Sequence, residues 1–303
     1  MKNNPDMNLR ARLAFCATRS PVLATCFLTS LLILAPGAGG FTAPVFAQTA
    51  IRQSGGTKFP IRITKSGSYI LETNLVVSAA ATDAIDVAVN DVTIDLNGFA
   101  IIGTGAGSGG KGVAGVGATI PSRTHVRNGY IEAFGTGVSL GSFASVENAT
   151  TFTDGSGINC ADDSRIVGSA ANGNSFGISA GANSVISGST ANSNTGIGIS
   201  AGDNSLVSGN TANDNINGDG ISCTGIGCQF SGNTASGNGF NGLGCDDRCL
   251  FSSNAANSNK SYGISCETPA NALITHNVLG GNTNGDINCG TSLGDNVCSG
   301  SKC

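Results

Sequence analysis

The sequence predicts an all-β solenoid, in which one chain winds into stacked coils of 20 to 23 residues. Two observations lead to this prediction: an unusual composition, and a repeat that keeps its register. Only 11% of the 303 residues are charged and 46 are Gly, whereas an average globular protein has about 25% charged residues and about 7% Gly. Gly, Asn, Ser and Thr form helices poorly, which excludes a helical bundle. A hydrophobic content of 40% also argues against a disordered chain.

The repeat centres on a motif of the form Gly-Ile-Ser-Ala or Gly-Ile-Ser-Cys. The apolar residues of this motif form a first column: Val138, Ile158, Ile178, Ile199, Ile221, Leu243, Ile264 and Ile287. A second column comprises Val126, Val146, Ile166, Ile186, Val207, Phe230, Phe251, Ile274 and Val297. Five residues after it come Ile131, Thr151, Ala171, Ala191, Ala212, Ala235, Ala256 and Leu279. Eight residues after it come Asn174, Asn194, Asn215, Asn238, Asn259 and Asn282. A disordered chain has no reason to keep four columns in register.

A unit of this length holds three short strands, which alternate apolar with polar residues and are separated by Gly and Asn turns. One unit cannot close a hydrophobic core by itself. When the units are stacked, each strand pairs with its copies above and below, about 4.8 Å away. The apolar columns then fill the bore, and the Asn column becomes a ladder of side-chain hydrogen bonds.

This pattern resembles the right-handed parallel β-helix proteins of the pectin-lyase-like superfamily, over roughly residues 59 to 298. The segments 67–71, 74–75 and 92–98 resemble the first coils of that family. The resemblance implies a single-stranded right-handed parallel β-helix, and the hand also agrees with the general rule for connections between parallel strands. We expect irregular coils and a cap at about 48–100, regular coils at about 113–298, and a disulfide-rich C-terminal end.

Residues 1–47 have the layout of a secretory signal peptide. Four basic residues precede an apolar stretch from Pro21 to Ala35, and the small residues Val45 and Ala47 predict cleavage after Ala47. The apolar stretch is shorter than the about 20 residues of a membrane span. Cleavage removes four basic residues and one Asp, which takes the formal net charge from −4 to −7. We therefore expect a secreted or periplasmic protein, residues 48–303, with no membrane span and, lacking a basic patch, no nucleic-acid partner.

Nine of the 11 Cys remain after this cleavage, in a compartment that permits disulfides. Stacked positions lie within the reach of a disulfide, and Cys160 is left unpaired. The alternatives are a column of buried thiols and a zinc site, which is disfavoured because no second half-site containing His follows the Cys-x-x-x-Cys pair. The expected pairs are Cys223 with Cys228, Cys245 with Cys249, Cys266 with Cys289, and Cys298 with Cys303.

One outward-facing group carries the candidate catalytic residues. Because Val126 points into the bore, its neighbours point outward, and the repeat aligns residues of the next two coils with them. Arg side chains suit sugar carboxylates, and a His or a carboxylate can exchange protons. The alternative is a solvated face with ordinary ion pairs. The candidates are His125, Arg127, Glu147, Asp163 and Arg165, with Arg123 beside them.

A second group of acidic residues follows the Gly-Ile motif, in the turns. Carboxylates in a turn can hold Ca²⁺, although neutral residues interrupt this row, for example at Asn183. The alternative is a set of solubilising turns. No other cofactor is expected. The calcium candidates are Asp162, Asp163, Asp203, Asp246, Asp247 and Glu267.

Two functions from different classes fit the sequence. The resemblance implies a polysaccharide-active enzyme, namely a lyase, hydrolase or epimerase that acts on acidic glycans. However, the family's Asp-Pro-His epimerase signature is missing, and the chain has no Trp and three Tyr with which to stack sugar rings. These features favour a non-catalytic binding or structural module at the cell surface or in the periplasm. Its expected partner is a carbohydrate or another cell-surface polymer.

Overall fold

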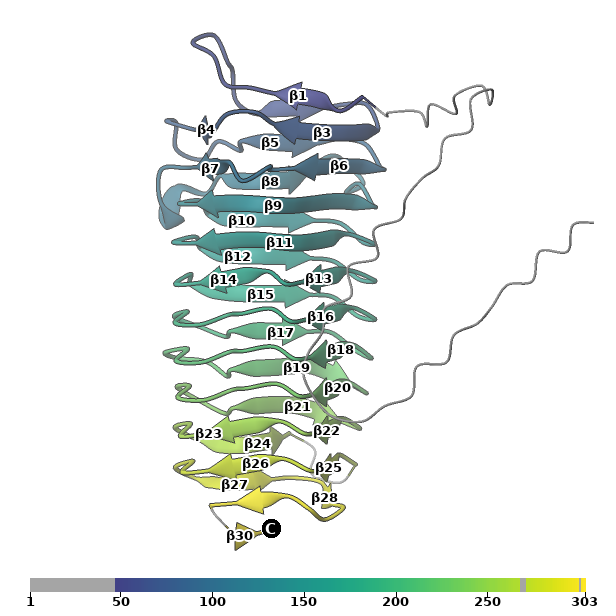
Figure 1. The fold of residues 1–303 in the computed structure, drawn as a ribbon, viewed down its shortest axis with the longest axis vertical. Coiled ribbons are helices and arrows are strands. Elements are labelled where there is room, and N and C mark those ends of the chain that lie inside the picture. Colours follow the sequence, from purple (N-terminus) through teal and green to yellow (C-terminus); the bar gives the residue numbers. More distant parts are fainter. Residues whose placement is uncertain (1–46, 268–270, 300) are drawn as a thin grey trace, which may run out of the picture. The chain divides into compact units, whose positions relative to one another are not determined.

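The computed structural model describes residues 47–267, 271–299 and 301–303, which form a right-handed parallel β-helix of about 12 coils (Figure 1). A coil averages about 21 residues, so the predicted fold class and period are confirmed. Apart from Ala47, the expected signal peptide lies outside the described residues. Within them the only helical turn is the 3-10 turn η1 (Ala106–Ser108), and no helix there has the length and apolarity to cross a bilayer.

The coils present three faces. Face 1 consists of β1 (Thr49–Ile51), β3 (Gly67–Leu71), β6 (Val92–Asp95), the first half of β9 (Thr124–Glu132) and of β11 (Ser145–Phe152), β13 (Arg165–Val167), β16 (Val185–Ser187), β18 (Leu206–Ser208), β20 (Gln229–Ser231), β22 (Leu250–Ser252), β25 (Leu273–Thr275) and β28 (Thr291–Ser292). Face 2 consists of β2 (Ile61–Ile63), β5 (Ile85–Val87), β8 (Lys111–Gly115), β10 (Thr136–Leu140), β12 (Ser156–Cys160), β15 (Phe176–Ala180), β17 (Ile199–Ala201), β19 (Ile221–Ile226), β21 (Leu243–Asp247), β24 (Tyr262–Cys266) and β27 (Gly285–Asn288). Face 3 consists of β4 (Leu75–Val76), β7 (Ala100–Ile102), the second halves of β9 and β11, β14 (Ala170–Asn172), the bridged residues Thr190, Thr211 and Thr234, β23 (Ala255–Asn257), β26 (Val278–Gly280), β29 (Val297–Cys298) and β30 (Ser301–Lys302).

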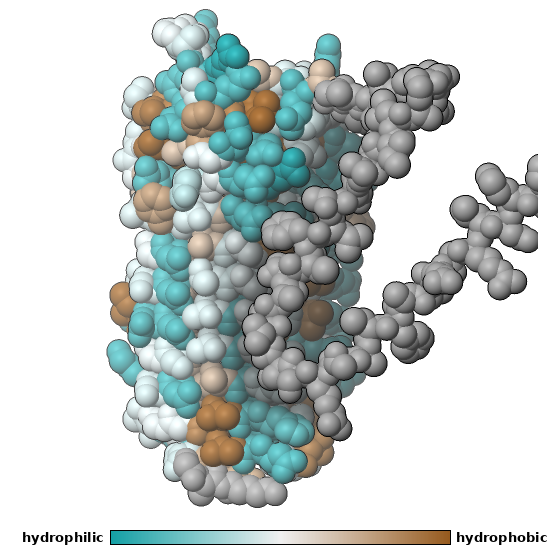
Figure 2. Space-filling model, viewed as in Figure 1, coloured by the Kyte–Doolittle hydropathy of each residue, from teal (hydrophilic) through white to brown (hydrophobic). Residues whose placement is uncertain are grey.

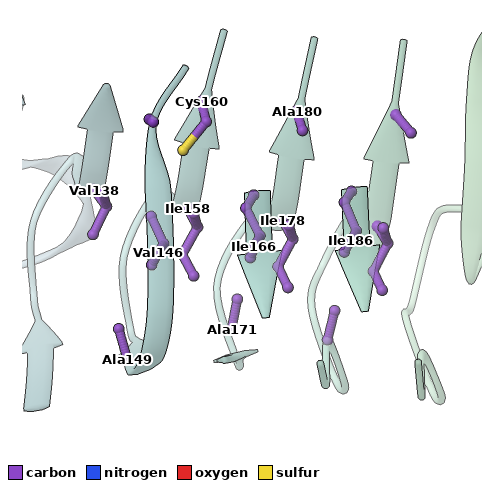
Figure 3. Packing of buried hydrophobic residues seen from close by; sticks show 14 of the residues in the cluster. Val138, Val146, Ala149, Ile158, Cys160, Ile166, Ala171, Ile178, Ala180 and Ile186 are labelled. Carbon is purple, nitrogen blue, oxygen red and sulfur yellow. The ribbon is translucent and has the colours of Figure 1, made fainter. Parts of the chain in front are cut away.

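The predicted apolar columns line the bore. Val138, Ile158 and Ile178 lie in register on successive strands of face 2, and Figure 3 shows them facing Val146 and Ile166 of face 1. Two larger members of the face 1 column, Phe230 and Phe251, stack with ring centroids 4.7 Å apart. The bore is therefore filled by side chains that repeat from coil to coil, as the sequence predicts.

Val297 is a correction to this scheme. It does not extend the second apolar column, because Ile274 of that column pairs with Ser292. Val297 instead pairs with Val278 on face 3, and its side chain is exposed. The reason is the length of the last coil, in which Asn296 already occupies the turn that precedes face 3.

The Asn ladder is confirmed. In each interior rung one side chain bonds both neighbouring coils: Asn215 Oδ1 accepts from the backbone N of Asn194 at 3.0 Å, and Asn215 Nδ2 donates to Ala191 O and to Asn238 Oδ1, both at 3.0 Å. The ladder occupies space left by Gly of the preceding unit. An added Cβ at Gly198 would lie 2.5 Å from Asn215 Nδ2. A Gly and an Asn from neighbouring units therefore define one buried contact.

A second buried ladder, which the sequence reasoning missed, lies three residues after the face 1 apolar column. It uses the same pattern: Asn233 Oδ1 accepts from Asn210 N at 3.0 Å, and Asn233 Nδ2 donates to Val207 O at 2.8 Å. Its first Asn, Asn210, accepts through Oδ1 from the backbone N of Ser189 at 2.9 Å, and Ser189 and Ser169 continue the column in the coils above. The lower rungs are Asn254, Asn277 and Asn296.

The four expected disulfides are present, and Cys160 is a buried free thiol. Cys223 and Cys245 are each bonded across one turn, to Cys228 and Cys249. In the following coil Ala272 stands where these partners would be, so Cys266 is bonded to Cys289 of the next coil. At the C-terminal end, β30 pairs antiparallel with β29. This last strand protects an edge that would otherwise expose unpaired backbone groups.

Candidate functional site

The predicted charged group assembles on face 1. His125 and Arg127 lie on β9, Glu147 pairs in register with Arg127, and Arg165 lies two coils from His125 in the same column. Asp163 lies in the turn before β13 with a positive φ of 57°, exposed but off the strand face. Figure 2 shows hydrophilic side chains gathered on this side over the upper coils. The structure thus brings four of the five candidates together, with Asp163 at their edge.

The arginines of this group are each paired with a carboxylate of the same chain. Arg127 Nε bonds Asp95 Oδ2 at 3.0 Å, and Arg165 Nη1 forms an ion pair with Glu147 Oε1. Arg123 makes a two-point contact with Asp91, at 2.6 and 2.9 Å, and this hydrogen bonding lowers the pKa of Asp91. Each arginine is therefore occupied by a carboxylate of the same chain. A sugar carboxylate would have to compete with that partner.

The calcium candidates do not form one site. Asp162 Oδ1 accepts from Ala182 N at 2.9 Å and Asp203 Oδ1 from Ile226 N at 2.8 Å, so both carboxylates brace the next turn. Asp247 contacts Arg248 at 3.2 Å. Within the described ranges, no group of three or more His, Cys, Asp or Glu side chains is arranged to hold a metal ion. Asp246 and Glu267 instead border a small polar hollow on face 2.

Face 2 carries a feature that the sequence reasoning did not single out: a row of small polar side chains in register on its outer surface. Each member follows the inward apolar residue of its coil, so its side chain points outward. The row, called the Ser/Asn row below, comprises Ser139, Asn159, Ser179, Ser200, Ser222, Gly244, Ser265 and Asn288. The Ser of the Gly-Ile-Ser motif was the available signal, because it follows an inward Ile in several coils.

A hollow of about 280 Å³ lies over this row on β12, β15 and β17. Phe176 forms one wall, with 55% of its surface exposed, and its ring rests against Gly196, where an added Cβ would lie 2.7 Å from the ring. The hollow thus combines an aromatic ring with hydroxyl and amide groups. Its lining is Ser156, Ile158, Asn159, Phe176, Gly177, Ile178, Ser179, Ile197 and Ser200.

These features define the class: a disulfide-bonded right-handed parallel β-helix. No protein-family model and no curated protein matches the chain. Among solved structures it is similar to a mutant of the periplasmic alginate epimerase AlgG, at 13% identity and a TM-score of 0.51, covering 66% of this chain and 58% of the epimerase. It is also similar to the A-module of the Azotobacter vinelandii mannuronan C-5 epimerase AlgE4, at 12% identity and a TM-score of 0.50, covering 72% and 70%. The chain spans less than two thirds of that AlgG structure, and at these low identities the likenesses show the fold alone.

Proposed function

We propose that this protein is a non-catalytic polysaccharide-binding module, and that the Ser/Asn row of face 2 is its binding surface. The observation that carries the proposal is the hollow beside Phe176. Sugar rings pack their C–H faces on aromatic side chains, while their hydroxyl groups bond to Ser and Asn side chains, which both donate and accept. The hollow offers both kinds of contact side by side.

The geometry of the row supports a polymer as the ligand. Each coil advances along the axis by the spacing of paired strands, about 4.8 Å. Each sugar residue of an extended polysaccharide advances the chain by about the length of one pyranose ring, which is similar to this spacing. Successive sugars can therefore meet successive members of the row. The likeness in fold to epimerases named for alginate and mannuronan supports a carbohydrate as the ligand class.

The lining of the hollow also supports binding without catalysis. It consists of Ser, Asn, Gly, Ile and Phe residues, and none of these side chains exchanges protons near neutral pH as a general acid or base must. The four disulfides fit a secreted or periplasmic location. The expected signal peptide, residues 1–47, agrees with that location.

The test is calorimetric titration of the protein with soluble oligosaccharides from a panel of neutral, acidic and amino polysaccharides. Phe176→Ala should weaken binding by about tenfold or more, which is the loss of one stacked sugar. Phe143→Ala is the matched control, because Phe143 is also 55% exposed but lies in a turn outside the hollow. Equal losses in the two variants would contradict this placement of the site.

The alternative is a polysaccharide-active enzyme, favoured by the grouping of His125, Arg127, Glu147 and Arg165 on face 1. Product analysis on the same panel, with and without Ca²⁺, separates the two functions. New oligosaccharides that disappear with His125→Ala or Glu147→Ala would establish the enzyme and locate its site. Binding without products, unchanged in both variants, is what the binding module requires.

A further inference from the structure

The Ser/Asn row has one gap, at Gly244 on β21. Ser222 and Ser265 are its register partners on the coils above and below. Without a side chain at Gly244 a hollow of about 80 Å³ opens, lined by Asp219, Ser222, Asn241, Gly244, Cys245, Asp246, Ser265 and Glu267. It lies on the coils that directly follow Ser200, so it extends the row that contains the Phe176 hollow.

Two polar groups point into this gap. A Cβ at Gly244 would lie 3.0 Å from Asp219 Oδ2 and 3.6 Å from Ser222 Oγ. Ser222 is only 9% exposed, and within the described residues its hydroxyl has no hydrogen-bond partner. Asp219 accepts through Oδ1 from Asn241 N at 2.9 Å and also hydrogen-bonds the Asn241 side chain. Buried polar groups are normally hydrogen-bonded, so a nearly buried, unpartnered hydroxyl beside the carboxylate of Asp219 indicates a polar ligand.

The electrostatics of the hollow select a cation. Burial raises the pKa of Asp219, and burial together with the charges of Glu267 and Asp203 raises the pKa of Asp246. Both effects disfavour a charged carboxylate in the hollow, and a bound cation would oppose them. The carboxylates around the hollow do not converge as metal ligands, as in the rest of the described chain. An ammonium group suits this arrangement better, because its three N–H donors can reach acceptors that lie apart.

We propose that the gap at Gly244 is a subsite for the ammonium group of an amino sugar, so that the polysaccharide held by the Ser/Asn row contains de-N-acetylated hexosamine. This substrate class rests on the proposed binding function. In the subsite Asp219 supplies the charged acceptor, Ser222 supplies a neutral one, and the missing Cβ of Gly244 provides the space.

The test compares glucosamine oligomers with fully N-acetylated oligomers of the same length, by calorimetric titration at a mildly acidic pH where the amine is charged. Asp219→Asn keeps the acceptor for Asn241 N and removes the charge. It should weaken binding of the amino oligomer about tenfold and leave the affinity for the acetylated oligomer within about twofold of the wild-type value. Asp214→Asn is the matched control, because Asp214 is an exposed acid outside this lining.

A second pair of variants tests the space instead of the charge. Gly244→Ala and Gly244→Ser both fill the gap, and the serine also completes the row. Each should remove the preference for the amino oligomer while the acetylated oligomer still binds. Unfolding midpoints of all variants are measured first, so that a misfolded variant is recognised.

The outcomes separate the two proposals. Equal affinity of the wild-type protein for both oligomers, or an unchanged preference in Asp219→Asn, would overturn the ammonium subsite. So would Ca²⁺ binding that is lost in Asp219→Asn without any amino preference. Phe176→Ala could leave the affinity for both oligomers unchanged while Asp219→Asn still weakens binding of the amino oligomer. That result would support the ammonium subsite and contradict the placement of the polymer along the Phe176 hollow.

Discussion

Asp154 and Asn174 are successive members of one buried column: the backbone N of Asp154 donates to Asn174 Oδ1 at 2.9 Å. An acid thus stands at the head of the Asn ladder. Its Oδ1 accepts from Phe134 N at 2.7 Å, as an Asn would, but its Oδ2 takes the place of an amide NH₂ and has no hydrogen-bond partner within the described residues. In the rungs below, the NH₂ group donates to carbonyl oxygens, as Asn194 Nδ2 does to Ala171 O. A protonated carboxyl would supply the missing donor.

The first prediction concerns pH. Burial raises the pKa of Asp154 to about 8, with the Phe134 bond opposing this rise and Glu132 adding to it. The pKa of Asp154 in the folded protein exceeds its unfolded value of about 3.9. Its contribution to the free energy of unfolding is therefore complete below about pH 4 and is lost as pH rises to about 8. Each unit of difference corresponds to about 1.4 kcal/mol. Asp154→Asn should remove this loss, so its gain in unfolding free energy over wild type should grow between about pH 5 and about pH 8.

Chemical denaturation across that pH range checks this prediction. The control is Asp214→Asn, which alters an exposed acid. A difference between Asp154→Asn and wild type that stays constant with pH would show that Asp154 is ionised in the folded protein.

The second prediction concerns a single rung. Asn215→Ala deprives Asn194 of its acceptor and leaves Ala191 O without its side-chain donor, both in the buried interior. We expect a loss of roughly 2 to 4 kcal/mol of unfolding free energy, since each buried group left unsatisfied costs about 1 to 3 kcal/mol. Asn217→Ala, at an exposed site two residues on, should change it by less than about 0.5 kcal/mol. Similar midpoints for both variants in urea would refute the ladder's contribution.

The third prediction concerns Cys160. Burial raises the pKa of its thiol to about 12, so the reactive thiolate is scarce at neutral pH. Iodoacetamide should leave the folded protein, produced as residues 48–303, unlabelled. Under denaturing conditions without a reductant it should add a single label, at Cys160, because the other eight Cys of residues 48–303 are in disulfides. Peptide mass spectrometry locates the label, and more than one label would contradict the pairing.

The fourth prediction concerns the bond between coils. Cys266–Cys289 closes a loop with a sequence separation of 23, and such a loop contributes about 3 kcal/mol in the chain-entropy model. Replacing both residues with Ala should lower the unfolding midpoint and increase proteolysis in the last coils. Replacing Cys245 and Cys249, whose loop is shorter, should have a smaller effect. The reverse order would show that strain or packing outweighs loop closure.

The sequence predicted the fold well because every coil repeats the same physical requirement. A column such as Val138, Ile158 and Ile178 has to face inward in each unit, so register could be read from spacing. The disulfides followed from the same register. The prediction for Val297 was wrong because this residue belongs to the last coil, where no further unit confirms the spacing. The second Asn ladder was missed because Ser189 and the coils above it lack Asn at this position.

The candidate site was harder to predict, because surface chemistry does not repeat in the same way. His125, Arg127, Glu147 and Arg165 attracted attention as charged residues, and the structure does gather them. Yet the pairing of Arg127 with Asp95 comes from a coil whose register the repeat did not define. The gap at Gly244 was not predicted, because its only sequence signal is the absence of a side chain at one position of the row.

The contact between Gly198 and Asn215 has a consequence for how such a protein changes over time. Each member comes from a different unit, so altering one unit alone damages two contacts, one with each neighbour. A duplicated or deleted complete unit, in contrast, finds matching surfaces on both sides. Gain and loss of whole coils is therefore a milder change than substitution within one, and each added coil brings another outward Ser or Asn. If the proposed binding function holds, the length of polymer that the Ser/Asn row can hold is set by the number of units in the gene.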